Sequence, residues 1–284
     1  MRRLKQQSNL KNKRASGLLD FYPNARFGYS FRRLRDAYTG ACIRVRRASD
    51  NVEQDIGFIN EGTAYWIDEN ALVTFTGASK SYVVKIYDQG LTANDAIQNT
   101  ALNQLEICNA GIITKNGTRP TFVFTGIEFY NILEINGALK WSTFKIVTAA
   151  NVNDEDTPTI ANSGSYNLYD LFQNRDGGGG FYLTVWGNEG NVTADPITPG
   201  AAIPKSILSC IYAYNSSIVY QNATNRPLTS NTALTNTAKF LVLGKVGPGN
   251  YCTGDFQEYV FYSTDQTTNR TAIVTNINAA FLVF

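Results

Sequence analysis

Residues 207–220 read Ile-Leu-Ser-Cys-Ile-Tyr-Ala-Tyr-Asn-Ser-Ser-Ile-Val-Tyr and hold two short apolar segments, 207–214 and 217–220. β-Branched and aromatic residues dominate such segments along the chain, and a pleated strand favours these residue types. We predict further strands at 43–46, 72–76, 82–87, 121–125, 143–149, 181–186, 239–243 and 257–262. Stretches rich in Asn, Thr, Gly, Asp and Pro separate them and favour turns. The pattern predicts an all-β fold, a two-sheet antiparallel sandwich of the jelly-roll kind.

Two helices are expected beside the strands. Phe31, Leu34 and Tyr38 recur at helical spacing and Gly40 follows, which predicts a short N-terminal helix. Residues 263–266, Ser-Thr-Asp-Gln, match a capping box at the start of a C-terminal helix. An apolar stripe then extends to about residue 280, and 281–284 is expected to return as a final strand that completes the core.

Composition excludes several classes of protein. The chain has 284 residues, 43% hydrophobic and 17% charged, which is sufficient for a core and unlike a disordered chain. No apolar run reaches membrane-spanning length, and no apolar segment follows the basic start, so we predict no signal peptide. Histidine is absent, which removes His-based triads and most zinc sites, and we expect no metal or cofactor. Four separated cysteines, Cys42, Cys108, Cys210 and Cys252, are interpreted as buried thiols, with one or two disulfides as the alternative.

Positive charge is concentrated at the start of the chain. Residues 1–50 carry a formal net charge of +10 and the remainder carries −8. We therefore divide the chain into a basic arm, 1–16, and a sandwich domain, 17–284. A basic surface often docks onto an acidic partner. The candidate docking residues are Arg2, Arg3, Lys5, Lys11, Lys13, Arg14, Arg32, Arg33 and Arg35. The alternative is that the last three lie on a solvated helix face; nucleic acid is the lesser partner.

Three groups of residues resemble a family of phage virion proteins with concanavalin A-like domains of the laminin-G jelly-roll type. The first is Tyr29-Ser30-Phe31-Arg32-Arg33-Leu34-Arg35, with 37–40 and 43–51 after it. The second is Ile86-Tyr87-Asp88-Gln89 with Asn94, Ala96, Gln98 and Asn103-Gln104, and the third runs from Glu258 to Asn278. The resemblance implies a virion structural protein of the capsid surface, head fibre or tail, assembled in the host cytoplasm. Its expected partners are other virion proteins, further copies of itself and a host-surface glycan.

The same landmarks are similar to the catalytic domain of B-type α-L-arabinofuranosidases. Two features depart from that pattern: Gly90-Leu91-Thr92-Ala93 replaces a Gly-rich turn, and the adjacent-cysteine pair is absent. No catalytic residue is therefore carried over, and we predict that the chain is not an enzyme. The alternative function is a glycan-active protein, either a lectin-like adhesin or an arabinofuranosidase-like retaining glycoside hydrolase.

Retaining glycosidases use two carboxyl groups about 5–5.5 Å apart. The carboxylates embedded in apolar sequence are Asp88, Glu128, Glu134, Asp255 and Glu258, and we expect backbone amides to satisfy each of them. A sugar site combines an aromatic platform with amide or carboxylate partners. The candidate carbohydrate-binding residues are Trp66, Asp68, Tyr87, Asp88, Gln89, Trp186 and Asn188. The alternative is that such aromatics belong to the core or to a subunit interface.

Overall fold

The structure is a computed structural model. It describes residues 17–136, 140–149, 160–161, 169–175, 180–187, 190–194, 203–213, 216–231, 239–247, 250–251 and 253–284. Within these, residues 133–140, 149–203, 229–242 and 245–252 are described by their backbone alone.

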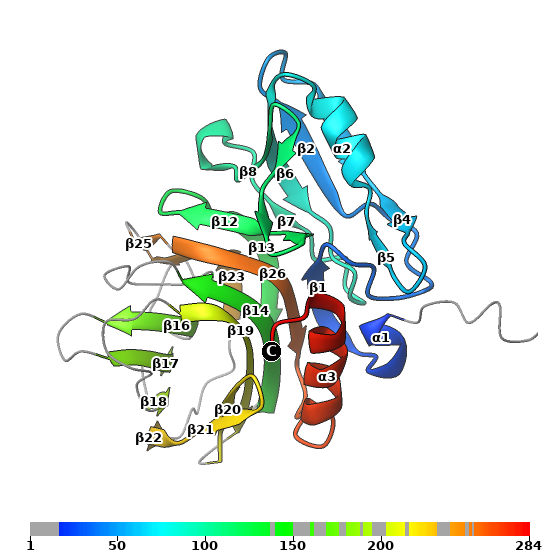
Figure 1. The fold of residues 1–284 in the computed structure, drawn as a ribbon. Helices are drawn as coiled ribbons and strands as arrows, with labels where there is room; N and C mark the ends of the chain where they lie inside the picture. The colour runs from blue at the N-terminus through cyan, green and yellow to red at the C-terminus, as the bar shows by residue number, and fades with distance from the viewer. Residues whose placement is uncertain are drawn as a thin grey trace, which may run out of the picture.

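The first sheet contains seven strands in the described part of the chain, with the order β1-β26-β14-β19-β20-β21 (Figure 1). β12 follows β1 along the same edge of β26, since both pair with it while β14 takes its other edge. The strands are β1 (Ala25–Ser30), β12 (Phe122–Thr125), β14 (Lys140–Ala149), β19 (Ile203–Ala213), β20 (Ile218–Gln221), β21 (Thr224–Arg226) and β26 (Thr253–Tyr262).

The second sheet contains thirteen strands in the same part of the chain, with the order β22-β18-β17-β16-β15-β23-β13-β7-β6-β2-β3; β8 also pairs with β6, and β9 pairs with β8. Its first strands along the chain are β2 (Ile43–Arg47), β3 (Glu53–Ile56), β6 (Lys80–Ile86), β7 (Ala96–Ile97), β8 (Glu106–Asn109), β9 (Ile112–Ile113) and β13 (Tyr130–Asn136). The later ones are β15 (Ile160–Ala161), β16 (Tyr169–Arg175), β17 (Gly180–Gly187), β18 (Gly190–Ala194), β22 (Leu228–Asn231) and β23 (Lys239–Leu243). Every recorded pairing is antiparallel, so the predicted all-β sandwich is confirmed.

Short elements complete the described chain. Three two-stranded ribbons are formed by β4 (Phe58–Asn60) with β5 (Tyr65–Ile67), β10 (Lys115–Asn116) with β11 (Arg119–Pro120), and β24 (Lys245–Gly247) with β25 (Asn250–Tyr251). The helices are α1 (Leu18–Phe21), α2 (Glu69–Thr76) and α3 (Arg270–Phe281), and a 3₁₀ turn spans Ala101–Asn103. None of the described helices has the length and apolar character needed to cross a membrane.

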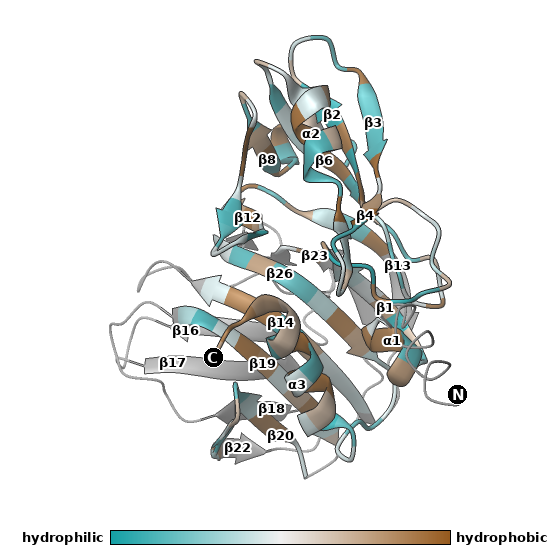
Figure 2. Ribbon diagram, turned by 45° about the vertical axis from the view of Figure 1, so that its right-hand side comes forward, coloured by the Kyte–Doolittle hydropathy of each residue, from teal (hydrophilic) through white to brown (hydrophobic). Residues whose placement is uncertain are grey.

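The central strands of the first sheet are buried on both faces. Along β14, Trp141 and Val147 join the core between the sheets, whereas Phe144 and Ile146 face the opposite side. That outer side is covered by α3, which runs across the apolar strands in Figure 2. Alternate side chains of a strand point to opposite faces. A strand in the middle layer therefore needs apolar residues at nearly every position, which explains the continuous apolar runs in the sequence.

Two elements predicted within residues 31–76 are wrong. Residues 31–38 form no helix, because the side chain of Gln89 binds their backbone and keeps this segment extended, as described below. Residues 72–76 are not a strand but the second half of α2, which begins where the Asp68 carboxylate accepts a hydrogen bond from the amide of Ala71. Leu72 and Phe75, one helical turn apart, are buried there.

The C-terminal helix is confirmed, but its ends differ from the prediction. It begins after Asn269 rather than at Ser263, and Gln266 donates to the hydroxyl of Thr264 instead of closing a capping box. The expected final strand does not form, because Leu282 takes the left-handed conformation that ends α3. Asn278 then binds the two amides that follow. Leu282 is 81% exposed, so only part of this end completes the core.

Candidate functional site

The turn at Asp88 and Gln89 fastens strand β1 to the second sheet. Asp88 accepts hydrogen bonds from the amides of Gly28 at 2.8 Å, Gly90 at 2.6 Å and Asn94 at 2.8 Å. Burial raises the pKa of this carboxyl group, and the three amides act against that rise. A β-carbon on Gly90 would lie 2.8 Å from the α-carbon of Phe27, so glycine permits the close approach.

Gln89 is fully buried and uses both ends of its amide. Its oxygen accepts a hydrogen bond from the amide of Leu34 at 2.7 Å. Its nitrogen donates to the carbonyls of Ser30 and Arg32 at 2.9 and 3.0 Å. These bonds replace the intrahelical bonds that a helix at 31–38 would make, so the segment stays extended. Asp88 and Gln89 thus bind backbone groups of residues 28–34 and of their own turn. The structure gives these two predicted sugar-binding residues a structural role.

Arg32 is buried in an ion pair rather than placed on a solvated helix. Its Nε and Nη2 donate to Glu258 at 2.7 and 2.8 Å, and its Nη1 donates to Asn276 of α3 at 2.8 Å. Arg32 is 6% exposed and Glu258 is 0% exposed. The pair joins β26, α3 and the segment after β1. This placement contradicts the expectation that Arg32 belongs to an exposed docking surface.

The remaining docking candidates lie elsewhere. Arg33 pairs with Asp36 at 2.7 Å, and its guanidinium lies 3.6 Å from the ring centroid of Tyr65. Arg35 donates to the carbonyl of Gly90 at 2.6 Å. The six basic residues Arg2, Arg3, Lys5, Lys11, Lys13 and Arg14 lie outside the described residues.

The other predicted sugar-binding residues do not form one described cluster. Trp66 is 3% exposed, and it packs against Phe281 and beneath the guanidinium of Arg119 at 3.7 Å. Asp68 caps α2 and lines an open depression of about 730 Å³ beside Phe75. Tyr87 donates its hydroxyl to Asp55 at 2.8 Å, and burial with this bond raises its pKa to about 12. The side chain of Trp186 and all of Asn188 lie outside the described part.

The described carboxylate candidates are all bound within the chain. Glu128 accepts from the amide and hydroxyl of Thr125 at 2.6 and 2.8 Å, which closes its own turn. Asp255 accepts from Asn116 at 3.0 Å, and burial raises its pKa. Asp88 binds backbone amides and Glu258 binds Arg32, as described above. Of the five candidates, only Glu134 has a side chain outside the described residues. Only Asp88 and Glu128 accept from backbone amides as predicted; Glu258 binds side chains instead.

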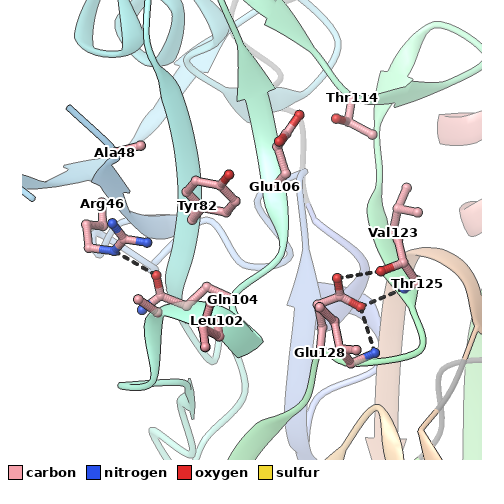
Figure 3. Close-up of a pocket in the computed structure, with 12 residues that line it drawn as sticks. Arg46, Ala48, Tyr82, Leu102, Gln104, Glu106, Thr114, Val123, Thr125 and Glu128 are labelled. Carbon is pink, nitrogen blue, oxygen red and sulfur yellow. Dashed lines mark hydrogen bonds between the residues drawn. The ribbon is translucent and has the colours of Figure 1, made fainter.

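A groove of about 620 Å³ lies where β8 of the second sheet runs beside β12 of the first (Figure 3). We refer to it as the β8–β12 groove. It is lined by Arg46, Ala48, Tyr82, Ala101, Leu102, Gln104, Glu106, Thr114, Val123, Thr125, Ile127 and Glu128. Strand register builds its first wall: Arg46 of β2 lies opposite Tyr82 of β6, which lies opposite Glu106 of β8. Side chains paired in this way stand next to one another on one face.

The sequence prediction missed this groove. The predicted sugar-binding residues combine an aromatic residue with an amide or carboxylate within a few positions, whereas the groove residues are spread over residues 46–128. The alternation in 82–87 places Tyr82 on a half-exposed face of β6, and this was the one local signal. In the described part of the chain, no group of three or more Cys, Asp or Glu residues could hold a metal ion.

Three of the four cysteines predicted to be buried thiols have described side chains. Cys42, Cys108 and Cys210 are buried thiols outside any disulfide, and burial raises the pKa of the Cys42 thiol. The side chain of Cys252 lies outside the described residues.

Comparisons with known proteins give a family-model match over part of the chain and a fold. Residues 25–162 match the family model for the catalytic domain of α-L-arabinofuranosidase B, and this stretch includes every residue of the β8–β12 groove. No curated protein sequence matches the chain.

Three solved arabinofuranosidase structures superpose on the chain at 16% sequence identity. A GH54 α-L-arabinofuranosidase mutant soaked with 4-nitrophenyl α-L-arabinofuranoside gives a TM-score of 0.69. The GH54 enzyme soaked with a cyclic sulfate inhibitor gives 0.67, and an arabinofuranosidase complexed with arabinofuranosyl-α-1,2-xylobiose gives 0.66. Each superposition covers 93% of this chain and 65% of the other, so the chain spans about two thirds of their length. The chain therefore has an arabinofuranosidase-like β-sandwich fold.

Proposed function

We propose that this chain is a glycan-active protein that binds α-L-arabinofuranosyl residues. The observation that carries this proposal is the match of residues 25–162 to the arabinofuranosidase catalytic-domain model. The fold agrees over 93% of the chain. The β8–β12 groove lies within the matched stretch, and it offers the mixture of aromatic, hydroxyl and carboxylate groups that a sugar site uses.

Hydrolysis of the bound arabinofuranoside is the second candidate function, and the same family model supports it, since it describes a catalytic domain. A retaining mechanism requires a nucleophilic carboxylate and a second carboxyl group as general acid. Asp88, Asp255 and Glu258 are buried and hydrogen-bonded within the chain, which argues against any of them as a member of the catalytic pair. Glu106 and Glu128 line the groove, with both oxygens of Glu128 held by Thr125 of the same turn, and Glu134 completes the set to test.

The test offers the purified chain two probes. Binding of arabinofuranosyl-α-1,2-xylobiose is measured by calorimetry, and turnover of 4-nitrophenyl α-L-arabinofuranoside is measured by absorbance. We expect saturable binding of the first. Turnover that is abolished in Glu106→Gln, Glu128→Gln or Glu134→Gln, but retained in Glu69→Gln, would establish the hydrolase. Binding without turnover would establish a binding protein, and the absence of both would refute the proposal.

A place in a virus particle, with other virion proteins and further copies of itself as partners, stays a prediction. It rests on the resemblance of residues 29–51, 86–104 and 258–278 to phage virion proteins, and the docking role of the arm rests on the concentration of positive charge in residues 1–50. Deleting residues 2–14 should leave the sandwich folded and reduce incorporation into particles. Normal incorporation of the truncated chain would remove the docking role from the basic arm.

A further inference from the structure

We propose that the β8–β12 groove is a binding site for a neutral saccharide, contacted by Tyr82, Glu106 and Thr114. This inference rests on the proposed function and adds the place and the residues of recognition. Figure 3 shows Tyr82, Glu106 and Thr114 following one another across the groove, with Val123, Thr125 and Glu128 on the other wall.

The hydrogen bonds of the groove divide its polar residues into two groups. Gln104 accepts from Arg46 at 2.9 Å and donates to the carbonyl of Gln98 at 2.8 Å. Both oxygens of Glu128 are held by Thr125. These polar groups are used within the fold and give the walls their shape. They are supports rather than ligand contacts.

The second group keeps unused hydrogen-bonding capacity. Among the described residues, neither the hydroxyl of Tyr82 nor that of Thr114 has a recorded partner. Glu106 lines the groove and accepts from Lys80 through its Oε2 at 2.8 Å, which leaves its Oε1 without a hydrogen bond to any described residue. A phenol, a threonine hydroxyl and a carboxylate oxygen can together donate to and accept from sugar hydroxyls. A bond from a sugar hydroxyl to the ionised Glu106 would be of the stronger, charge-assisted type.

Packing and charge favour a neutral sugar in particular. The guanidinium of Arg46 lies 5.3 Å from the ring centroid of Tyr82 and steadies the ring. Leu102 is 83% exposed and Ile127 is 53% exposed, and these two offer apolar contact to the carbon faces of a sugar. The groove is lined by the carboxylates Glu106 and Glu128 and by the cation Arg46, and Lys80 beside Glu106 adds a second cation, so these charges balance and suit a neutral ligand.

Calorimetric titration of the full chain tests the site. The probes are arabinofuranosyl-α-1,2-xylobiose and a panel of neutral xylo-, gluco- and manno-oligosaccharides. Tyr82→Ala and Glu106→Gln should each weaken binding about tenfold or more, and Thr114→Val less, because each removes one contact. Tyr65→Ala is the matched control for Tyr82, since Arg33 stacks on Tyr65 as Arg46 stacks on Tyr82. Glu69→Gln is the control for Glu106, since Glu69 pairs with Lys115 as Glu106 pairs with Lys80.

A readout without mutation guards against variants that fold poorly. Saturating sugar should slow amide hydrogen exchange in residues 104–109 and 122–128 of the unmodified chain. Tyr87→Ala separates this site from the one predicted from the sequence, because Tyr87 lies at the other end of β6 and bonds to Asp55.

Each outcome decides between the two proposals. If arabinofuranosyl sugar binds but the Tyr82 and Glu106 variants bind it equally well, the groove is wrong and the proposed function stands. If only other neutral sugars bind, and the variants lose them, the groove stands and arabinofuranosyl recognition is wrong. If no sugar in the panel binds, both are overturned.

Discussion

Two regions of the molecule carry similar side chains and use them in opposite ways. The latched segment, residues 28–34, is held by Asp88, Gln89 and Glu258, which are almost completely buried and bonded within the chain. The β8–β12 groove presents Tyr82, Glu106 and Thr114, which are only half-buried, on a surface open to solvent. In the groove, the hydroxyl of Tyr82 and one oxygen of Glu106 stay available for a ligand.

The difference teaches that the residue type does not decide the role. A buried polar group must find a partner inside the protein, because leaving it unpaired costs about 1–3 kcal/mol. The latched segment meets this requirement completely, and its polar atoms are then unavailable to a ligand. Function is expected where polar atoms remain unused beside an aromatic ring.

The largest loss of stability is expected when the ion pair between Arg32 and Glu258 is broken. Arg32→Ala leaves Glu258 charged and buried without its partner, so the free energy of unfolding should fall by about 3–5 kcal/mol. Arg44→Ala is the control, since Arg44 pairs with Asp55 at the surface, and its loss should cost about 1 kcal/mol or less. Urea unfolding followed by circular dichroism measures both. Equal losses for the two variants would contradict the structural role of the buried pair.

Removing the carboxylate of Asp88 should have the next largest effect. Asp88→Ala leaves the amides of Gly28, Gly90 and Asn94 without this acceptor and should lower the free energy of unfolding by about 1–3 kcal/mol; Asp88→Asn should cost less because one acceptor oxygen remains. Any fraction that folds should still bind the saccharide. A stable Asp88→Ala protein that has lost sugar binding would instead place Asp88 in the ligand site.

The pH dependence of stability should separate buried from exposed carboxylates. Burial raises the pKa of Asp255 above its ordinary value of 3.8, so its contribution is fully present below that pH and is lost as pH rises through the folded-state pKa. The hydrogen bond with Arg44 lowers the pKa of Asp55, so its contribution is present above pH 3.8 and is lost as pH falls through the folded-state pKa. Melting temperatures of Asp255→Asn and Asp55→Asn between pH 2.5 and 7 measure this, relative to the unmodified chain. The two differences should change with pH in opposite directions, and parallel changes would contradict the assignment.

The smallest expected effect is on the stability of groove variants. Tyr82→Phe removes a half-exposed hydroxyl, and Glu106→Gln weakens only the surface ion pair with Lys80, so the free energy of unfolding should change by about 0.5 kcal/mol or less. Thermal unfolding checks this. A large loss would mean that these side chains support the fold, and their effect on binding could no longer be assigned to sugar contact.

Much of the sandwich could be predicted because strand segments are local features. Predicted segments such as 143–149 and 257–262 lie within the observed β14 and β26. Helix spacing failed at 31–38, because Gln89 lies more than fifty residues away and binds that backbone. At 72–76 the error is the reverse: a strand is predicted, but a helix forms there because Asp68 caps its first turn.

The site was harder to predict for the same physical reason. Asp88 and Gln89 stand out in the sequence because they are adjacent, yet adjacency says nothing about burial. The row of Arg46, Tyr82 and Glu106 exists only after β2, β6 and β8 have paired in one register. No short-range pattern links these three positions, so the groove becomes visible only in the folded chain.

The most direct test is a crystal structure of the chain soaked with arabinofuranosyl-α-1,2-xylobiose. We predict sugar density in the β8–β12 groove, with hydroxyl groups within hydrogen-bond distance of Glu106 Oε1 and of the Tyr82 hydroxyl. Asp88 and Gln89 should keep their bonds to the latched segment unchanged. Sugar bound at any other place with the groove empty, or sugar that displaces the bonds of Asp88 and Gln89, would contradict the account.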